Sequence, residues 1–214
     1  MKNGQPDYIV VEGPIGVGKT TLAKRLAETF STDLMLEMAV ENPFLPRFYA
    51  DPGSVALPTQ LYFLFQRAKQ IEILRQTDLF KPVHVADFLI EKDKLFACIT
   101  LDDDEFSLYQ QVYERLTLDT PVPDLVIYLQ APVDVLMRRI MERGNDYEKL
   151  IEKNYLQQVA DAYVDFFYHY SISPLLIVNT VDFDLANGMG DYDLLLEHIL
   201  DLKPGRHYFN PKEL

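Results

Sequence analysis

Short apolar runs alternate along the chain with longer segments of helical periodicity. Five apolar runs predict strands at residues 8–12, 34–37, 82–87, 124–129 and 175–179. Most of them lack strict apolar–polar alternation, which is typical of strands that are covered on both faces. Apolar residues at helical spacing predict helices at residues 19–30, 58–77, 92–100, 104–118, 133–143, 147–170 and 191–200.

This alternation of strands and helices predicts an α/β fold. Strands that are joined through helices form a parallel sheet with helices on both faces. We therefore expect three layers, with a five-stranded parallel sheet between two layers of helices. The chain has 214 residues, of which 48% are hydrophobic, and it contains no internal repeat and no Gly/Ser linker. These features favour a single domain over residues 1–214.

The charge balance disfavours a protein that grips nucleic acid. The sequence has 33 acidic and 20 basic residues and a formal net charge of −13, whereas such binding depends on neutralising phosphates. Cys98 is the single cysteine, so neither an intrachain disulfide nor a cysteine metal cluster is expected. The sequence has no run of ~18 apolar residues and no signal-peptide pattern, which favours a cytoplasmic protein without a membrane span.

The sequence GPIGVGKT at residues 13–20 matches the P-loop pattern G-x-x-x-x-G-K-[ST] in full. A predicted strand precedes it and a predicted helix follows it, which is the context that a P-loop requires. Backbone N–H groups of such a loop surround phosphates at a helix start. The expected nucleotide-binding residues are Gly13, Ile15, Gly16, Val17, Gly18, Lys19, Thr20 and Thr21. In this motif Lys19 reaches the outer phosphates and the Thr20 hydroxyl binds Mg²⁺.

Polar residues lie at the ends of four predicted strands. They are Glu12, Glu37, Asp87 and Asn179. The carboxyl ends of parallel strands face the ligand crevice, so these side chains are expected near the P-loop. Three carboxylates around a phosphate loop suggest metal handling and proton transfer.

Several spaced motifs resemble those of the deoxynucleoside kinases, from about residue 7 to residue 179. The segments that carry the resemblance are VEGPIGVGKTT at 11–21, VENPFL at 40–45, FYADP at 48–52 and RIMERG at 139–144. The resemblance implies a P-loop NTPase fold and phosphorylation of a deoxynucleoside 5′-hydroxyl in nucleotide salvage. A nucleoside triphosphate such as ATP would be the donor, with Mg²⁺, and the chain would form a homodimer.

The resemblance also assigns roles to individual residues. Glu37 falls at the position of the general base, and Asp87 matches the acidic residue of an Asp/Glu-Arg-Ser motif. Tyr49 and Glu148 match residues that contact the sugar 3′-hydroxyl. Gln60 matches the glutamine that pairs with the nucleobase.

Two further assignments concern arginines. Arg67 lies two helical turns after Gln60, close to the nucleobase. Arg139 and Arg143 belong to an arginine-bearing lid at about residues 139–150.

The chemistry of phosphoryl transfer agrees with these roles, because the reaction needs positioning and neutralisation of charge. Glu37 is the candidate base, and Thr20 with Asp87 is the candidate Mg²⁺ site. Lys19, Arg139 and Arg143 are the candidate cations for the transferring group.

The sequence departs from the family pattern at three places. Phe88 and Leu89 stand where arginine and serine are expected, and Asn145 stands where the lid has another arginine. We expect Lys92 to replace the first missing cation. The stretch after Asp87 is one residue shorter than in better-known members, which leaves Asp93 as the candidate partner of Arg67.

Other functions stay open at this point. Arg67 and Asp93 favour deoxyadenosine, deoxyguanosine or deoxycytidine over thymidine, because charged groups can read an amino- or keto-bearing edge. A nucleoside monophosphate kinase, such as a thymidylate kinase, is the second enzyme reading. A nucleotide-binding regulatory subunit with low activity is the third, motivated by Phe88 and Asn145.

Overall fold

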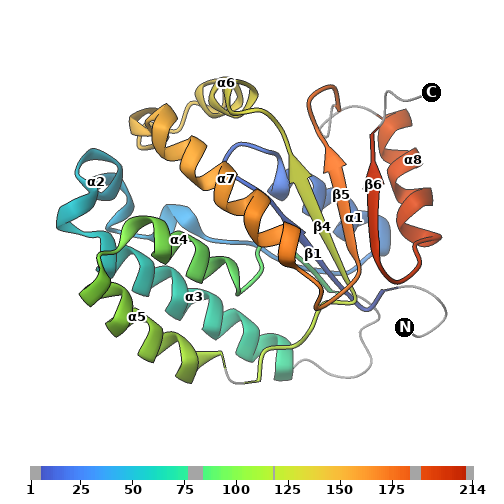
Figure 1. Cartoon of the computed structure of the whole chain (residues 1–214). Helices are drawn as coiled ribbons and strands as arrows, with labels where there is room; N and C mark the ends of the chain where they lie inside the picture. The colour runs from blue at the N-terminus through green and yellow to red at the C-terminus, as the bar shows by residue number, and fades with distance from the viewer. Residues whose placement is uncertain (1–5, 77–83, 118, 184–188, 211–214) are drawn as a thin grey trace.

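The computed structural model describes residues 6–76, 84–117, 119–183 and 189–210. In this part of the chain six strands form one sheet, in the order β2-β3-β1-β4-β5-β6, and every neighbouring pair is parallel. The strands are β1 (Tyr8–Glu12), β2 (Asp33–Met35), β3 (His84–Ala86), β4 (Leu125–Gln130), β5 (Leu175–Asn179) and β6 (Arg206–Phe209). Figure 1 shows the sheet at the centre of the molecule with helices around it.

The α/β sheet is confirmed, but the predicted number of five strands was one too few. β6 was missed because its residues are alternately exposed and half-buried, so it contributes no continuous apolar run. β2 ends at Met35, two residues earlier than predicted, so Glu37 follows the strand instead of ending it. Residues 82 and 83 of the predicted third strand lie outside the described residues.

Helices occupy most of the connections between strands. In the described ranges they are α1 (Lys19–Phe30), α2 (Leu45–Ala50), α3 (Ala56–Gln76), α4 (Lys92–Thr100), α5 (Asp103–Leu116), α6 (Val133–Arg143), α7 (Lys153–His169) and α8 (Met189–Leu200), with 3-10 turns at Ala39–Glu41, Pro52–Ser54 and Glu148–Leu150. The predicted helix 147–170 is shorter in the structure, because Ile151 and Glu152 have extended backbones that separate the last 3-10 turn from α7. The predicted helix ends at residues 77 and 118 lie outside the described residues.

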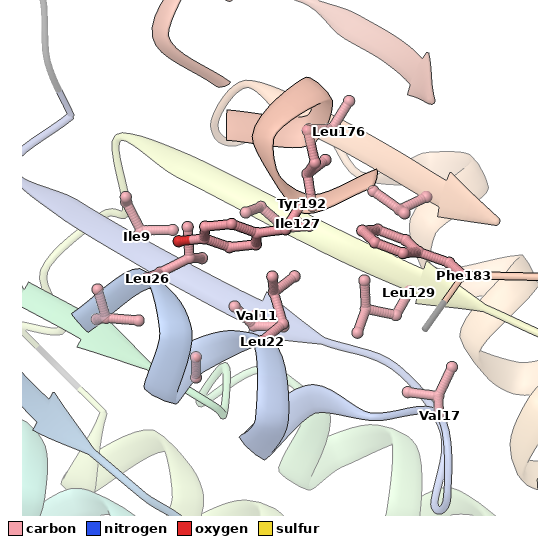
Figure 2. Close-up of a cluster of buried hydrophobic side chains, with 14 of the residues drawn as sticks. Ile9, Val11, Val17, Leu22, Leu26, Ile127, Leu129, Leu176, Phe183 and Tyr192 are labelled. Atoms are coloured by element: carbon pink, nitrogen blue, oxygen red, sulfur yellow. The ribbon is translucent and has the colours of Figure 1, made fainter. Parts of the chain in front are cut away.

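Two apolar clusters cover opposite faces of the sheet. Ile9 and Val11 of β1 pack with residues of α1, α6 and α8, whereas Val10 of the same strand packs with residues of α4 and α7. Figure 2 shows the first cluster, in which Leu22 and Leu26 of α1 lie against β1 and β4. Burial on both faces explains why β1 has no alternation of polar residues.

A further group of helices extends the molecule beyond the sheet. α3, α4 and α5 pack together around the buried side chains of Leu64, Ala97 and Tyr109, and they lie together in Figure 1. This group forms one side of the site described below. No helix in the described part of the chain is both long and apolar enough to cross a membrane.

The P-loop connects β1 to α1 and packs against α6. Val17 is fully buried and points into the first apolar cluster (Figure 2), which fixes the middle of the loop. Gly16 and Gly18 have φ values of +82° and +106°, a conformation that L side chains rarely adopt. A Cβ at Gly16 would lie 2.9 Å from the Leu136 carbonyl oxygen and 2.8 Å from Ile140 Cγ1.

We therefore expect Gly16→Ala to lower the free energy of unfolding by about 1–3 kcal/mol, the usual scale of strain at such a φ. The variant should also bind triphosphate more weakly, because the loop must shift away from α6. Urea unfolding and titration with ATP would measure both effects. Gly190→Ala is the matched control, since a Cβ there meets nothing within 4 Å. Equal stability and ATP affinity in wild type and Gly16→Ala would contradict this account.

Candidate functional site

A cavity of about 280 Å³ lies beyond the carboxyl ends of β1, β2 and β3. Its volume is close to the lower end of the ~300–1,000 Å³ range of small-molecule sites. Most of the predicted site residues line it: Ile15, Gly16, Lys19, Thr20, Glu37, Tyr49, Gln60, Arg67, Asp87, Arg143 and Glu148. The wall therefore combines the P-loop with residues from α2, α3 and the segment that follows α6.

The P-loop presents its donors to this cavity. Gly18 caps α1 in a left-handed conformation and no side chain caps the helix, so the first-turn N–H groups of Lys19, Thr20 and Thr21 are available to an anion. The Lys19 ammonium donates to the carbonyl oxygens of Gly13 at 2.8 Å and Pro14 at 3.2 Å. Burial lowers the pKa of Lys19.

Thr20 and Asp87 form a pair of oxygen ligands beside the P-loop. The Thr20 hydroxyl donates to Asp87 Oδ2 at 2.6 Å, and the Glu37 backbone N–H donates to Asp87 Oδ1 at 2.6 Å. Burial raises the pKa of Asp87. Mg²⁺ in kinases is held by one or two protein oxygens together with phosphate oxygens and waters, so these residues fit the ion. Among the described residues, no cluster of three or more potential ligands forms an all-protein metal site.

Glu37 lies between two buried cations. Its Oε1 is paired with Arg67, and the Lys92 ammonium lies 3.1 Å from its Oε2. Burial alone would raise the pKa of Glu37, but Arg67, Lys92 and Lys19 hold it well below its usual range. The carboxylate is therefore ionised at neutral pH.

Arg67 joins Glu37 to Asp93. Its guanidinium is paired with both carboxylates and lies 5.0 Å from the centre of the Phe63 ring. Gln60 and Arg67 both line the cavity, as expected for residues two turns apart on α3. The sequence-based pairing of Arg67 with Asp93 is thus present. Asp93 itself is fully buried and lies outside the lining, and burial raises its pKa to about 6.

The far wall of the cavity is formed by aromatic rings and an anchored glutamate. The Tyr49 and Tyr147 rings are stacked, with centroids 6.4 Å apart and planes 2° apart. Glu148 accepts hydrogen bonds from Arg143 at 2.7 Å and from Asn145 at 3.1 Å. Asn145, which replaces an expected lid arginine, therefore helps to hold Glu148 in place.

The two predicted lid arginines have different surroundings. Arg143 lines the cavity, whereas Arg139 does not. Arg139 donates to the Thr180 hydroxyl at 3.0 Å and to the Val17 carbonyl oxygen at 3.4 Å, which ties α6 to the P-loop and to the end of β5. Gly13, Val17, Gly18, Thr21 and Asp93 are the other predicted site residues that do not line the cavity. A role for Arg139 at the triphosphate stays a prediction.

Glu12 was expected near the P-loop as one of the strand-end carboxylates, whereas Tyr163, which contacts it, was not predicted as a site residue. Glu12 is fully buried, and it accepts hydrogen bonds from the backbone N–H groups of Gly13 and Leu89, each at 2.8 Å, and from the Tyr163 hydroxyl at 2.9 Å. The Lys92 ammonium lies 3.3 Å from Glu12 Oε1, the oxygen that also accepts from Leu89. The position of Glu12 at a strand end was visible in the sequence, but Tyr163 resembles any other core residue of a helix.

Comparison with known proteins agrees with this geometry. The family model described as "Deoxynucleoside kinase" matches residues 9–202. The chain belongs to the deoxynucleoside kinase family. A deoxyguanosine kinase of Bacillus subtilis (strain 168) is 36% identical over 201 residues, which cover 91% of this chain and 97% of that protein. A deoxyadenosine kinase of Lactobacillus acidophilus is 30% identical and covers 89% of this chain, with 94% of its own length matched.

Solved structures of the family share the fold. A deoxyadenosine kinase from M. mycoides with bound dATP has a TM-score of 0.77 at 22% identity, covering 92% of this chain and 100% of its own. A second structure of that enzyme, with the products dCMP and dCDP, has a TM-score of 0.79 at 21% identity, covering 91% of this chain and 100% of its own. At these identities the likeness concerns the fold.

The Glu12 contacts give a prediction about stability. We expect Tyr163→Phe to lower the free energy of unfolding by about 1–3 kcal/mol, because the buried carboxylate loses a donor while the ring packing is kept. Urea unfolding measures the difference. Tyr168→Phe, at a ring that is 70% exposed, is the control and should change little. Equal unfolding free energies for the two variants would show that the Tyr163 hydroxyl does not support Glu12.

Proposed function

We propose that this kinase transfers the γ-phosphoryl group of a nucleoside triphosphate, such as ATP, to the 5′-hydroxyl of a purine deoxynucleoside, with deoxyguanosine preferred. The observation that carries the proposal is the composition of one cavity wall. The phosphate-binding residues Lys19 and Thr20, the carboxylate of Glu37 and the polar side chains of Gln60 and Arg67 all line the same cavity. A nucleoside in this space can place its sugar beside the carboxylate and its base beside α3.

The chain supplies the groups that the transfer requires. Glu37 accepts the proton of the 5′-hydroxyl while the 5′-oxygen of the nucleoside bonds to the γ-phosphorus. The bond between the γ-phosphorus and the oxygen of the leaving nucleoside diphosphate breaks. Lys19 and Arg143 cover the negative charge of the transferring group. Thr20 and Asp87 would hold Mg²⁺, which would supply positive charge to neutralise the phosphates.

The nucleobase end of the cavity suits a base with hydrogen-bonding edges. Gln60 offers amide donors, and each terminal nitrogen of Arg67 keeps a second N–H beyond its ion pair for the O6 and N7 acceptors of guanine. Phe63 and Phe96 also line the cavity and supply flat apolar surface for a purine ring. The 36% identity to a deoxyguanosine kinase supports the same choice.

Sugar recognition and assembly complete the proposal. The Tyr49 hydroxyl and the Glu148 carboxylate are the groups proposed to contact the 3′-hydroxyl, and both residues line the cavity. We propose a role in nucleotide salvage in the cytoplasm, the location that the sequence favours. The homodimer expected from the resemblance stays a prediction. Exposed apolar side chains on α3 and α5, including Phe65 and Leu108, support it.

The choice of acceptor is tested with purified protein, ATP and Mg²⁺. ADP release should be fastest with deoxyguanosine among the four deoxynucleosides, because its edge matches the Gln60 and Arg67 donors. Thymidine as the best substrate would contradict the proposed base specificity. Faster transfer to deoxynucleoside monophosphates would favour a monophosphate kinase. ATP binding without transfer to any acceptor would favour a regulatory subunit.

The role of Glu37 is tested by Glu37→Gln. This variant should lower kcat by roughly 10²–10⁴-fold, the usual contribution of a general base, while KM for the nucleoside changes little. Steady-state kinetics with the preferred deoxynucleoside measures both constants. Glu41→Gln, at an exposed glutamate close in sequence, is the control and should keep the wild-type rate. An unchanged kcat in Glu37→Gln would exclude this residue as the base.

A further inference from the structure

We propose that Lys92 is a positioning residue that holds the Glu37 carboxylate in place by linking it to Glu12 at the end of β1. This inference rests on the proposed function, because it assigns a role in the same phosphoryl transfer. Lys92 lines the same cavity as Glu37 and Arg67, and the proposed function gives it no contact with the phosphates or the nucleobase.

The geometry places Lys92 between the two glutamates. Its ammonium lies 3.1 Å from Glu37 Oε2 and 3.3 Å from Glu12 Oε1, and its side chain is 2% exposed. Glu12 is itself fixed by N–H groups of the P-loop residue Gly13 and of Leu89. Lys92 therefore connects Glu37, the proposed general base, to Glu12 at the end of β1. Through Glu12 it is also connected to Gly13, the first residue of the P-loop.

Stability alone does not explain a lysine at this position. Lys92 is the first residue of α4, where the helix dipole disfavours a cation. Its burial removes the ammonium from water, and buried ion pairs are often no more stable than apolar side chains of similar volume. The helix dipole and the burial of the ammonium both oppose a lysine here. Its role in holding the Glu37 carboxylate explains why the position carries a charge.

The residues near Lys92 do not hold Glu37 in the same way. Phe88 and Leu89, which follow β3, are buried in the apolar cluster that covers one face of the sheet. Arg67 and Lys92 both line the cavity and both pair with Glu37, but Arg67 is shared with Asp93 on the side of the nucleobase, whereas Lys92 is shared with Glu12 beside the P-loop. The two cations hold different oxygens of Glu37, Arg67 the Oε1 and Lys92 the Oε2. The carboxylate therefore keeps its orientation toward the 5′-hydroxyl.

A double-mutant comparison tests whether Lys92 acts through Glu37. Lys92→Met keeps the length of the side chain and removes its charge. In wild type it should lower kcat by ~10²-fold, the scale of a small displacement of a reacting group, with KM for the nucleoside nearly unchanged. In the Glu37→Gln background the same substitution should make no further difference to kcat. Lys94→Met, two residues away, removes a lysine that lies over the Tyr113 ring and should leave the rate unchanged.

The outcomes separate this inference from the proposed function. If the wild-type chain transfers no phosphate to any deoxynucleoside, the proposed function fails. If wild type is active but Lys92→Met lowers kcat equally in both backgrounds, or raises KM alone, Lys92 does not act through Glu37 and the inference is wrong. Circular dichroism checks the fold of each variant. Should Lys92→Met not fold, Lys92→Gln, which keeps an N–H donor, takes its place in the same comparison.

Discussion

The site depends on a buried line of alternating charges. Glu12, Lys92, Glu37, Arg67 and Asp93 follow one another, and each cation is paired with the carboxylates on both sides of it. A charge in a protein interior is costly unless it is paired, so each member of the line holds its neighbours in place. One end of the line meets the P-loop and the other lies within the helices of the base pocket. Glu37, in the middle, is oriented from both directions.

The α/β topology brings these residues together from distant parts of the sequence. β1 and β3 are adjacent and parallel in the sheet, so the residues that follow their carboxyl ends lie close together. Asp87 follows β3 and fixes the backbone of Glu37. α3 and α4 pack together beyond the sheet and bring Arg67 close to Lys92 and Asp93. Sheet order therefore sets the phosphate end of the site, and helix packing sets the nucleoside end.

Much of this arrangement could be predicted from sequence, because its signals are local. The P-loop has fixed spacing, the central strands are continuous apolar runs, and Gln60 and Arg67 share a helix face. Contacts across the fold carry no such signal. The Tyr163 hydroxyl donates to Glu12, which is 151 positions away in the sequence, and Arg139 donates to Thr180. Neither contact could be predicted from the residues that flank it in the sequence. β6 was missed because an alternately exposed edge strand has no strong apolar pattern.

The central claim is that a deoxynucleoside lies in this cavity with its 5′-oxygen beside Glu37 and its base beside Gln60 and Arg67. A crystal structure with bound deoxyguanosine tests it most directly. The account predicts the 5′-oxygen within hydrogen-bonding distance of the Glu37 carboxylate and the guanine edge within hydrogen-bonding distance of Gln60 or Arg67. A nucleoside bound elsewhere, or with its 5′-oxygen directed away from Glu37, would contradict the account.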